Sequence, residues 1–230
     1  MNKSLVNELA ALFYPHACVV CGAELLENED GVCLKCLYQL PRTHNYLERE
    51  NEAEQHMAAR ISFERIATYC VYSKGGMLEP LIHHLKYHGK KEIGLLLGRL
   101  FGRDLLGSDF LNSIDWIVPV PLHPKREKER GYNQAEMIAR GLSEATSLPV
   151  LTGNLVRVIF NPTQTKRTKT QRWENVKGIF EVVDSSLFEG KHLLLVDDVI
   201  TTGSTIEACG LALQACKGVK ISIATLGQVL

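Results

Sequence analysis

The sequence predicts an α/β protein with a mostly parallel sheet covered by helices on both faces, preceded by a small ribbon built around four cysteines. Three observations support this. From about residue 63 onward, short apolar runs alternate with segments of helical period. One of these runs, residues 193–205 (LLLVDDVITTGST), leads into two adjacent acids and a loop rich in hydroxyl groups. Four cysteines lie near the amino terminus as two Cys-x-x-Cys pairs.

Charge and apolar runs exclude some classes of protein. The chain has 26 basic and 26 acidic residues, but residues 1–60 hold nine acids against five bases. An acidic front is thus joined to a mildly basic body, and neither charge by itself indicates a nucleic-acid partner. No apolar run approaches the ~18 to 20 residues of a membrane helix, and the start lacks a leader pattern. We expect a cytoplasmic protein without a membrane span.

Residues 18–36 predict a structural zinc site. Cys18 and Cys21 form one pair, and Cys33 and Cys36 form the other after eleven residues. Two such turns can place four thiolates tetrahedrally around one ion. Two disulfides are the alternative, which a reducing cytosol disfavours. Because four thiolates fill the coordination shell, we expect the ion to stabilise a ribbon and to leave no open position for catalysis.

The chain is expected to have three parts. Residues 1–40 form an amino-terminal helix and the ribbon, with Leu5, Leu9 and Leu12 on one helical face. Residues 41–62 are polar and acidic with little hydrophobic period, which is typical of a connector that is partly helical. Residues 63–230 form the body. Its expected strands are 65–72, 114–122, a strand near 148–151, 178–183, 192–196 and 220–226, and its expected helices include residues 78–85, 93–100, 135–142 and 204–216.

The run from 193 to 205 indicates a ligand site. In sheets of this kind, ligands lie at the carboxyl ends of strands, where Asp197 and Asp198 follow the apolar run. Residues 201–205 can direct backbone N–H groups and hydroxyls at a phosphate, and Gly203 permits close approach. The acids can accept hydrogen bonds from sugar hydroxyls or interact with Mg²⁺. A simple helix cap with a turn residue is the alternative, and it explains one hydroxyl and one acid only.

These residues resemble a known signature. LLLVDDVITTGST is similar to the 5-phosphoribosyl 1-diphosphate (PRPP) motif of the type I phosphoribosyltransferases. The resemblance implies that Asp197 and Asp198 bind the ribose hydroxyls as the catalytic pair, and that the 201–205 loop binds the 5-phosphate. It implies PRPP or a similar sugar phosphate as ligand, together with Mg²⁺.

Two further stretches resemble the ComF family of competence proteins. They are VPVPLHPKREKERGYNQAEMIA from Val118 and QTKRTKTQRWENVKGIF from Gln164, and the cysteine ribbon completes the same arrangement. By position, Arg130 and the loop after it are expected to hold the diphosphate, and the resemblance places a lysine, here Lys86, near the phosphates. The expected substrate-binding residues are Thr201, Thr202, Gly203, Ser204, Thr205, Arg130, Asn133, Gln134, Lys86, Gln164, Arg172 and Asn175.

Three functions remain open from the sequence. The first is a PRPP-binding protein that transfers the phosphoribosyl group and releases diphosphate, with a role in DNA uptake implied by the resemblance. The second is a non-catalytic PRPP sensor. The third is a single-stranded DNA-binding module that uses the zinc ribbon and residues 157–177, which hold six bases and one acid. DNA-uptake machinery and a homodimer are left open as partners, as is the acceptor.

Overall fold

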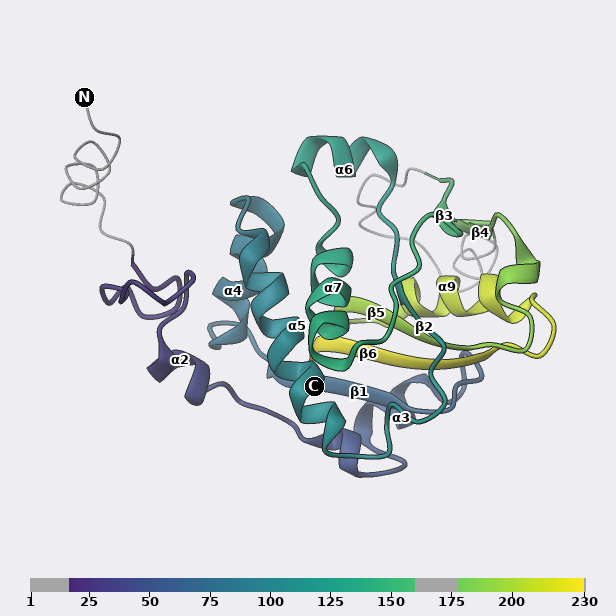
Figure 1. Cartoon of the computed structure of the whole chain (residues 1–230), viewed down its shortest axis with the longest axis horizontal. Helices are drawn as coiled ribbons and strands as arrows, with labels where there is room; N and C mark the ends of the chain where they lie inside the picture. Colours follow the sequence, from purple (N-terminus) through teal and green to yellow (C-terminus); the bar gives the residue numbers. More distant parts are fainter. Residues whose placement is uncertain (1–16, 160–177, 230) are drawn as a thin grey trace.

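The computed structural model describes residues 17–159 and 178–229. A four-stranded parallel sheet lies at its centre, with strand order β1-β6-β5-β2, and β3 and β4 form a separate antiparallel pair (Figure 1). The strands are β1 (Ile66–Tyr72), β2 (Trp116–Pro119), β3 (Leu155–Arg157), β4 (Phe180–Val182), β5 (His192–Ile200) and β6 (Lys220–Val229). The α-helices are α2 (Leu34–Tyr38), α3 (Glu52–Met57), α4 (Leu78–Tyr87), α5 (Lys91–Leu106), α6 (Pro124–Arg130), α7 (Gln134–Thr146) and α9 (Ser204–Gln214), with 3₁₀ turns at Asn45–Leu47 and Ser185–Leu187.

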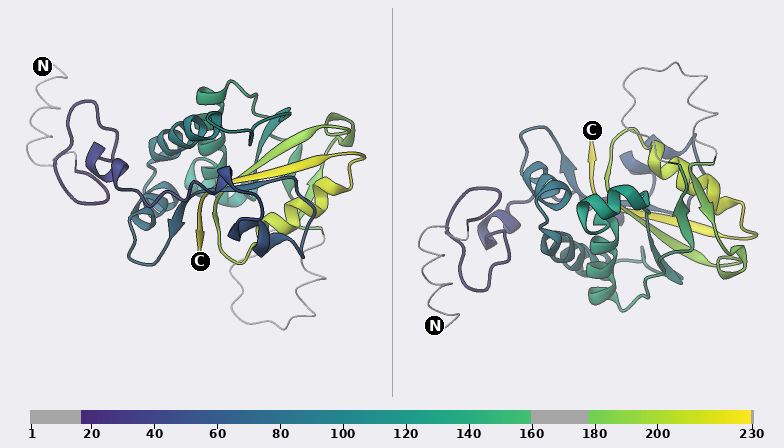
Figure 2. Two further views of the ribbon diagram at one scale, coloured as in Figure 1. Left: turned by 90° about the horizontal axis from the view of Figure 1, so that it is seen from below. Right: turned by 90° about the horizontal axis from the view of Figure 1, so that it is seen from above.

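Helices cover both faces of the sheet, which confirms the predicted fold class. Alternate side chains of β5 enter two separate cores. Leu194 and Val196 face α4, α5 and α7, in what we call the α5–α7 core. Leu193 and Leu195 face α3 and α9, in what we call the α3–α9 core. Helices α3 and α9 cover this face of the sheet (Figure 2). Burial on both faces explains why β5 is continuously apolar up to its two acids.

The expected strand positions are correct with one exception. Near residues 148–151 the chain makes only an isolated parallel pairing between Ile117 and Val150. The next regular strand is β3, which leaves the main sheet and pairs with β4. β5 is also longer than expected, since it continues to Ile200 and contains both acids. Within the described residues, no helix is long and apolar enough to span a membrane.

Residues 41–62, predicted as a connector, make extensive contacts with the sheet. The Asn51 side chain caps α3 and donates to the carbonyl oxygen of Ile66 at 2.9 Å. Glu54 accepts from the amide of Ile66 at 3.0 Å, and Ala53 and Met57 are fully buried in the α3–α9 core. These bonds attach α3 to the start of β1. The three domain boundaries themselves remain a prediction.

Helices α5 and α7 approach closely because glycines face each other across their contact. A Cβ atom at Gly98 would lie 2.3 Å from the carbonyl oxygen of Ile138, and one at Gly141 would lie 2.2 Å from that of Leu95. Backbone atoms of a packed helix cannot move aside cheaply, so only glycine fits at these two positions.

We therefore expect Gly141→Ala to lower the free energy of unfolding by about 2 kcal/mol or more, as overpacking does in well-packed cores. Gly107→Ala is the matched control, because its Cβ would meet only the carbonyl oxygen of Asp104 at 3.4 Å. Urea denaturation measures both variants. Equal stability of the two variants would contradict the close helix contact.

Candidate functional site

The loop between β5 and α9 forms a small pocket at the carboxyl edge of the sheet. Asp197 and residues 199–206 line it. Within the loop, the four residues with hydroxyl groups are exposed and Gly203 is buried. Gly203 has φ 75°, in the left-handed region, and directs the chain into α9. Since N–H groups in the first turn of a helix have no helical partner, the pocket is suited to an anionic group.

The loop rests on residues that the sequence did not reveal. A Cβ at Gly203 would lie 2.5 Å from Sδ of Met57, so the end of α3 packs directly against the loop. Beside it, Arg60 donates to the Glu207 carboxylate in the first turn of α9 at 3.1 Å. Neither contact has a signal in the polar composition of residues 41–62, because both depend on how that segment folds back.

The two acids of β5 lie on opposite faces of the sheet. Because both are inside the strand, Asp197 shares the face of Leu195 toward α9, and Asp198 shares the face of Val196 toward α4. The Lys86 ammonium donates to Oδ1 of Asp198 at 2.7 Å. Oδ2 of Asp198 is buried and has no hydrogen-bond partner within the described part of the chain. A buried carboxylate oxygen without a donor is costly, so this atom points to a ligand.

Burial and charge separate the two acids chemically. Burial, followed by the charge of Asp198, raises the pKa of Asp197 to about 7. Burial alone would lower the pKa of Lys86, but the charge and hydrogen bond of Asp198 outweigh it, so the pKa of Lys86 is raised overall. Lys86 therefore stays protonated and compensates one oxygen of Asp198.

Residues 130–134, from the end of α6 to the start of α7, contact the end of α4 beside Lys86. The Arg130 guanidinium lies over the ring of Tyr87, 5.8 Å from its centre, and donates to the side-chain carbonyl of Gln134. The Tyr132 hydroxyl donates to the carbonyl oxygen of Leu85. The structure thus brings Arg130 and Lys86 to the same end of α4. Binding of one anion by these two groups remains a prediction.

Asn133 is used internally. Its side-chain oxygen Oδ1 accepts from the backbone amide of Ala135 at 3.0 Å and caps α7. Its side-chain nitrogen Nδ2 donates to the backbone carbonyl oxygen of Val120 at 2.9 Å. It therefore fixes the start of α7 against the chain that leaves β2. A substrate contact by Asn133 or Gln134 remains a prediction. Outside the described residues lie Gln164, Arg172 and Asn175.

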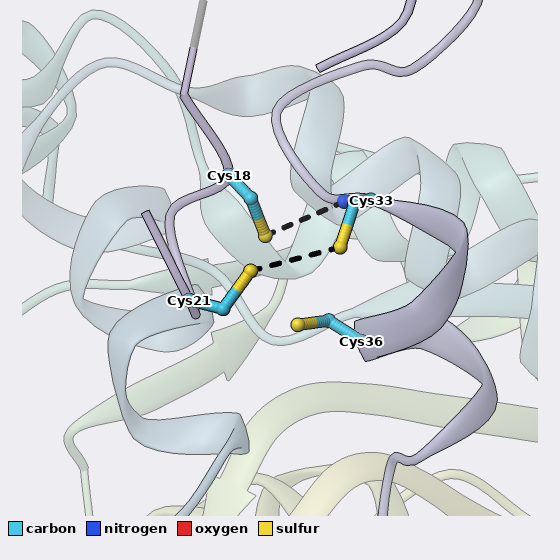
Figure 3. Close-up of side chains that lie close together, drawn as sticks. All are labelled: Cys18, Cys21, Cys33 and Cys36. Carbon is cyan, nitrogen blue, oxygen red and sulfur yellow. Dashed lines mark hydrogen bonds between the residues drawn. The ribbon is translucent and has the colours of Figure 1, made fainter. Parts of the chain in front are cut away.

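The four amino-terminal cysteines gather as predicted. Their sulfur atoms all lie within 4.8 Å of one another and point toward a common centre (Figure 3). All four are free thiols, and the amide of Cys33 donates to Sγ of Cys18 at 3.4 Å. Burial would raise the pKa of Cys18, but backbone N–H donors outweigh it and lower the pKa to about 6. Four thiol ligands at this spacing fit a structural metal ion such as zinc.

The ribbon is continuous with the body. Buried ribbon residues belong to the α5–α7 core, which also holds Ile82 and Ile93. A Cβ at Gly31 of the ribbon would lie 3.8 Å from the Ile93 side chain. Metal loss would therefore disturb packing against α4 and α5 as well as the ribbon.

Comparisons with known proteins agree with this geometry. A phosphoribosyl transferase domain model matches residues 128–228. "DNA utilization protein YhgH" of Salmonella typhi is 33% identical over 206 residues, and "Competence protein F" of Haemophilus influenzae is 30% identical over 210 residues. Each alignment covers 85% of this chain and 89% of the relative. "Competence protein ComFC" of Bacillus subtilis is 27% identical over 221 residues, covering 92% of this chain and 77% of that protein.

Cys21 is the exposed member of the cysteine cluster, and this makes the metal site testable. We expect Cys21→Ser to abolish stoichiometric zinc and to lower the melting temperature, because ion binding contributes folding free energy. Cys216→Ser, at a buried cysteine far along the chain, is the control and should retain zinc. Elemental analysis and thermal denaturation measure both effects. Absence of bound metal from the wild-type protein would rule out the site.

The raised pKa of Asp197 predicts a pH-dependent stability difference. Between the ordinary carboxyl pKa and about 7, the folded state holds a proton that the unfolded state has released, so this group makes stability fall as pH rises through that window. Asp197→Asn removes this loss of stability at higher pH, because asparagine does not titrate. The variant should match the wild type below about pH 4 and exceed it above pH 7, by at most about 4 kcal/mol.

Asp115→Asn provides a control of opposite sign. The backbone amide of His192 and the Lys191 ammonium lower the pKa of Asp115, so this carboxylate adds stability above its unfolded pKa. The control should be less stable than the wild type at pH 7 and equal to it at the lowest pH. Thermal denaturation from pH 3 to 8 tests both variants, and parallel curves for Asp197→Asn and the wild type would contradict burial of this acid.

Proposed function

Because the chain belongs to the ComF/YhgH family of competence proteins and carries their phosphoribosyltransferase domain, we propose that it binds PRPP and transfers its phosphoribosyl group to an acceptor, with release of diphosphate. The observation that carries the proposal is the position of the acid pair. Asp198 has a buried oxygen that no described residue hydrogen-bonds, and the adjoining loop forms an anion pocket at a helix start. A molecule with sugar hydroxyls next to a phosphate satisfies both needs.

Each part of the ligand has a partner in this proposal. The 5-phosphate lies in the 201–205 loop, and the ribose hydroxyls donate to Asp198 and Asp197. Lys86 and Arg130, at the end of α4, face the diphosphate. Mg²⁺ bound with the diphosphate would neutralise its charge, and Asp198 is the carboxylate with an oxygen available to it.

The residues present supply positioning and charge for the transfer. The bond from C1 of the ribose to the diphosphate oxygen breaks, and its electron pair leaves with the diphosphate. A nucleophilic atom of the acceptor forms the new bond to C1. As the leaving group gains charge, Lys86 and Arg130 stabilise it, since both are cations at one end of the site.

The relatives suggest a cellular role. Relatives are called competence or DNA utilization proteins, and we propose a role in DNA uptake for this chain as well. The free cysteines favour the reducing cytoplasm. DNA binding by the ribbon and the basic residues 157–177 is the competing proposal, and it requires an affinity for single strands that falls steeply with salt.

Calorimetric titration of PRPP with Mg²⁺ tests the proposal. We expect the wild-type protein to bind and the double variant Asp197→Asn/Asp198→Asn to lose at least about a hundredfold in affinity, since both hydroxyl acceptors lose their charge. Glu24→Gln, at an exposed acid of the ribbon, is the control and should bind like the wild type.

The outcomes separate the candidate functions. Binding that only the double variant loses supports the site and justifies a search for acceptors that release diphosphate. If the wild type fails to bind PRPP but binds single-stranded DNA with a strong salt dependence, the DNA-binding proposal replaces this one.

A further inference from the structure

A second pocket lies one strand away from the acid pair. Its volume is about 300 Å³, within the range that holds small molecules. Its walls come from the end of β2, the starts of α6 and α7, and β3. Helix α6 and strand β3 lie beyond the carboxyl end of β2 (Figure 1). Between two prolines of this wall, the amide of Val120 donates to the carbonyl oxygen of Val196, the residue before Asp197. The pocket is therefore adjacent to the acid pair.

The walls of this pocket are largely apolar and stiff. Three prolines line it, at positions 119, 121 and 124, together with aliphatic side chains of β2 and β3. Proline rings are rigid and present flat apolar surfaces, so the walls need no ordering when a ligand enters. A flat ring fits such walls better than a flexible chain.

Among the described residues that line this pocket, Arg157 is the one cation. Arg157, the last residue of β3, lies over the ring of Phe180 with 5.5 Å between the guanidinium and the ring centre. Its one hydrogen bond among the described residues is a long one, 3.4 Å from Nε to the carbonyl oxygen of Ile159, and it makes no ion pair with a carboxylate of that part of the chain. A partly buried guanidinium with spare donors is suited to an anionic oxygen group.

The other charges place the positive end of the pocket at β3. Glu136, on the helical side, is held by Arg140 at 2.7 Å and is thereby compensated. Glu127 is exposed on α6. Burial and the nearby Arg126 lower the pKa of Arg157, whereas Cys209 and Asp197 raise it by smaller amounts. Arg126 adds to the positive potential at this end.

We propose that this pocket binds a flat ring that carries an anionic oxygen group, with Arg157 bound to that group, and that the ring is the acceptor. The role of the ring as acceptor rests on the proposed function, whereas binding of the ring at this site does not. Arg157 then determines specificity: it favours a charged ring over a neutral ring of the same shape.

Nicotinate and nicotinamide are matched probes, because they share one ring and differ in charge. Calorimetry or ligand-observed NMR on the full chain should show nicotinate binding at least about tenfold more tightly than nicotinamide, which is the effect of one charge-assisted hydrogen bond. Arg157→Gln should remove the preference, and Arg157→Lys should keep part of it. Arg103→Ala, at an exposed arginine of α5, should leave it unchanged.

PRPP titration of the same variants distinguishes the two proposals. The Arg157 variants should bind PRPP within about twofold of the wild type, which also shows that they are folded. If PRPP binds but nicotinate binds no better than nicotinamide, the inference is overturned and the proposed function stands. If nicotinate binds through Arg157 and PRPP does not bind, the ring site stands and the proposed function fails. An equal loss in Arg103→Ala overturns the role of Arg157.

Discussion

Two carboxylates buried at the end of a central strand are the constraint on which the rest of the site depends. A buried charge is stable only when it is paired and hydrogen-bonded, and within the described ranges 17–159 and 178–229 Asp198 meets this condition at one oxygen, through Lys86. The last turn of α4 must therefore end against β5. Residues 130–134 hold this turn in place, because the Tyr132 hydroxyl donates to the carbonyl oxygen of Leu85 and the Arg130 guanidinium lies over the Tyr87 ring. Lys86 is thus positioned by its ion pair with Asp198, and Arg130 by its contact with the Tyr87 ring.

The same α5–α7 core links the site to the ribbon. Helix α5 packs on α7 through facing glycines, and Ile93 at its start contacts the ribbon beside the cysteine cluster. On the opposite face, α3 supports the phosphate loop through Met57. The amino-terminal residues therefore contribute to the architecture of the ligand site on both faces of the sheet, although Asp197 and Asp198 lie far from them in the sequence.

The sequence by itself determined the chemistry that is encoded locally. The spacing of Cys18, Cys21, Cys33 and Cys36 predicted a four-thiol cluster, because each pair needs only a short turn to bring its sulfurs together. The apolar run before Asp197, and the glycine and hydroxyl groups after Asp198, predicted a strand, a loop and a helix start in that order. Period and turn chemistry extend over a few residues, so a single segment carries these signals.

Only the tertiary structure decided which distant groups meet. Lys86 pairs with Asp198, 112 residues away, because strand alternation turns that acid toward α4 and its neighbour toward α9. The glycine contact of α5 and α7, the support of Gly203 by Met57 and the exposure of Arg157 to a pocket likewise join segments that share no local pattern. Contacts through space depend on packing and register, which periodicity does not encode, so the residue types were predictable and their partners were not.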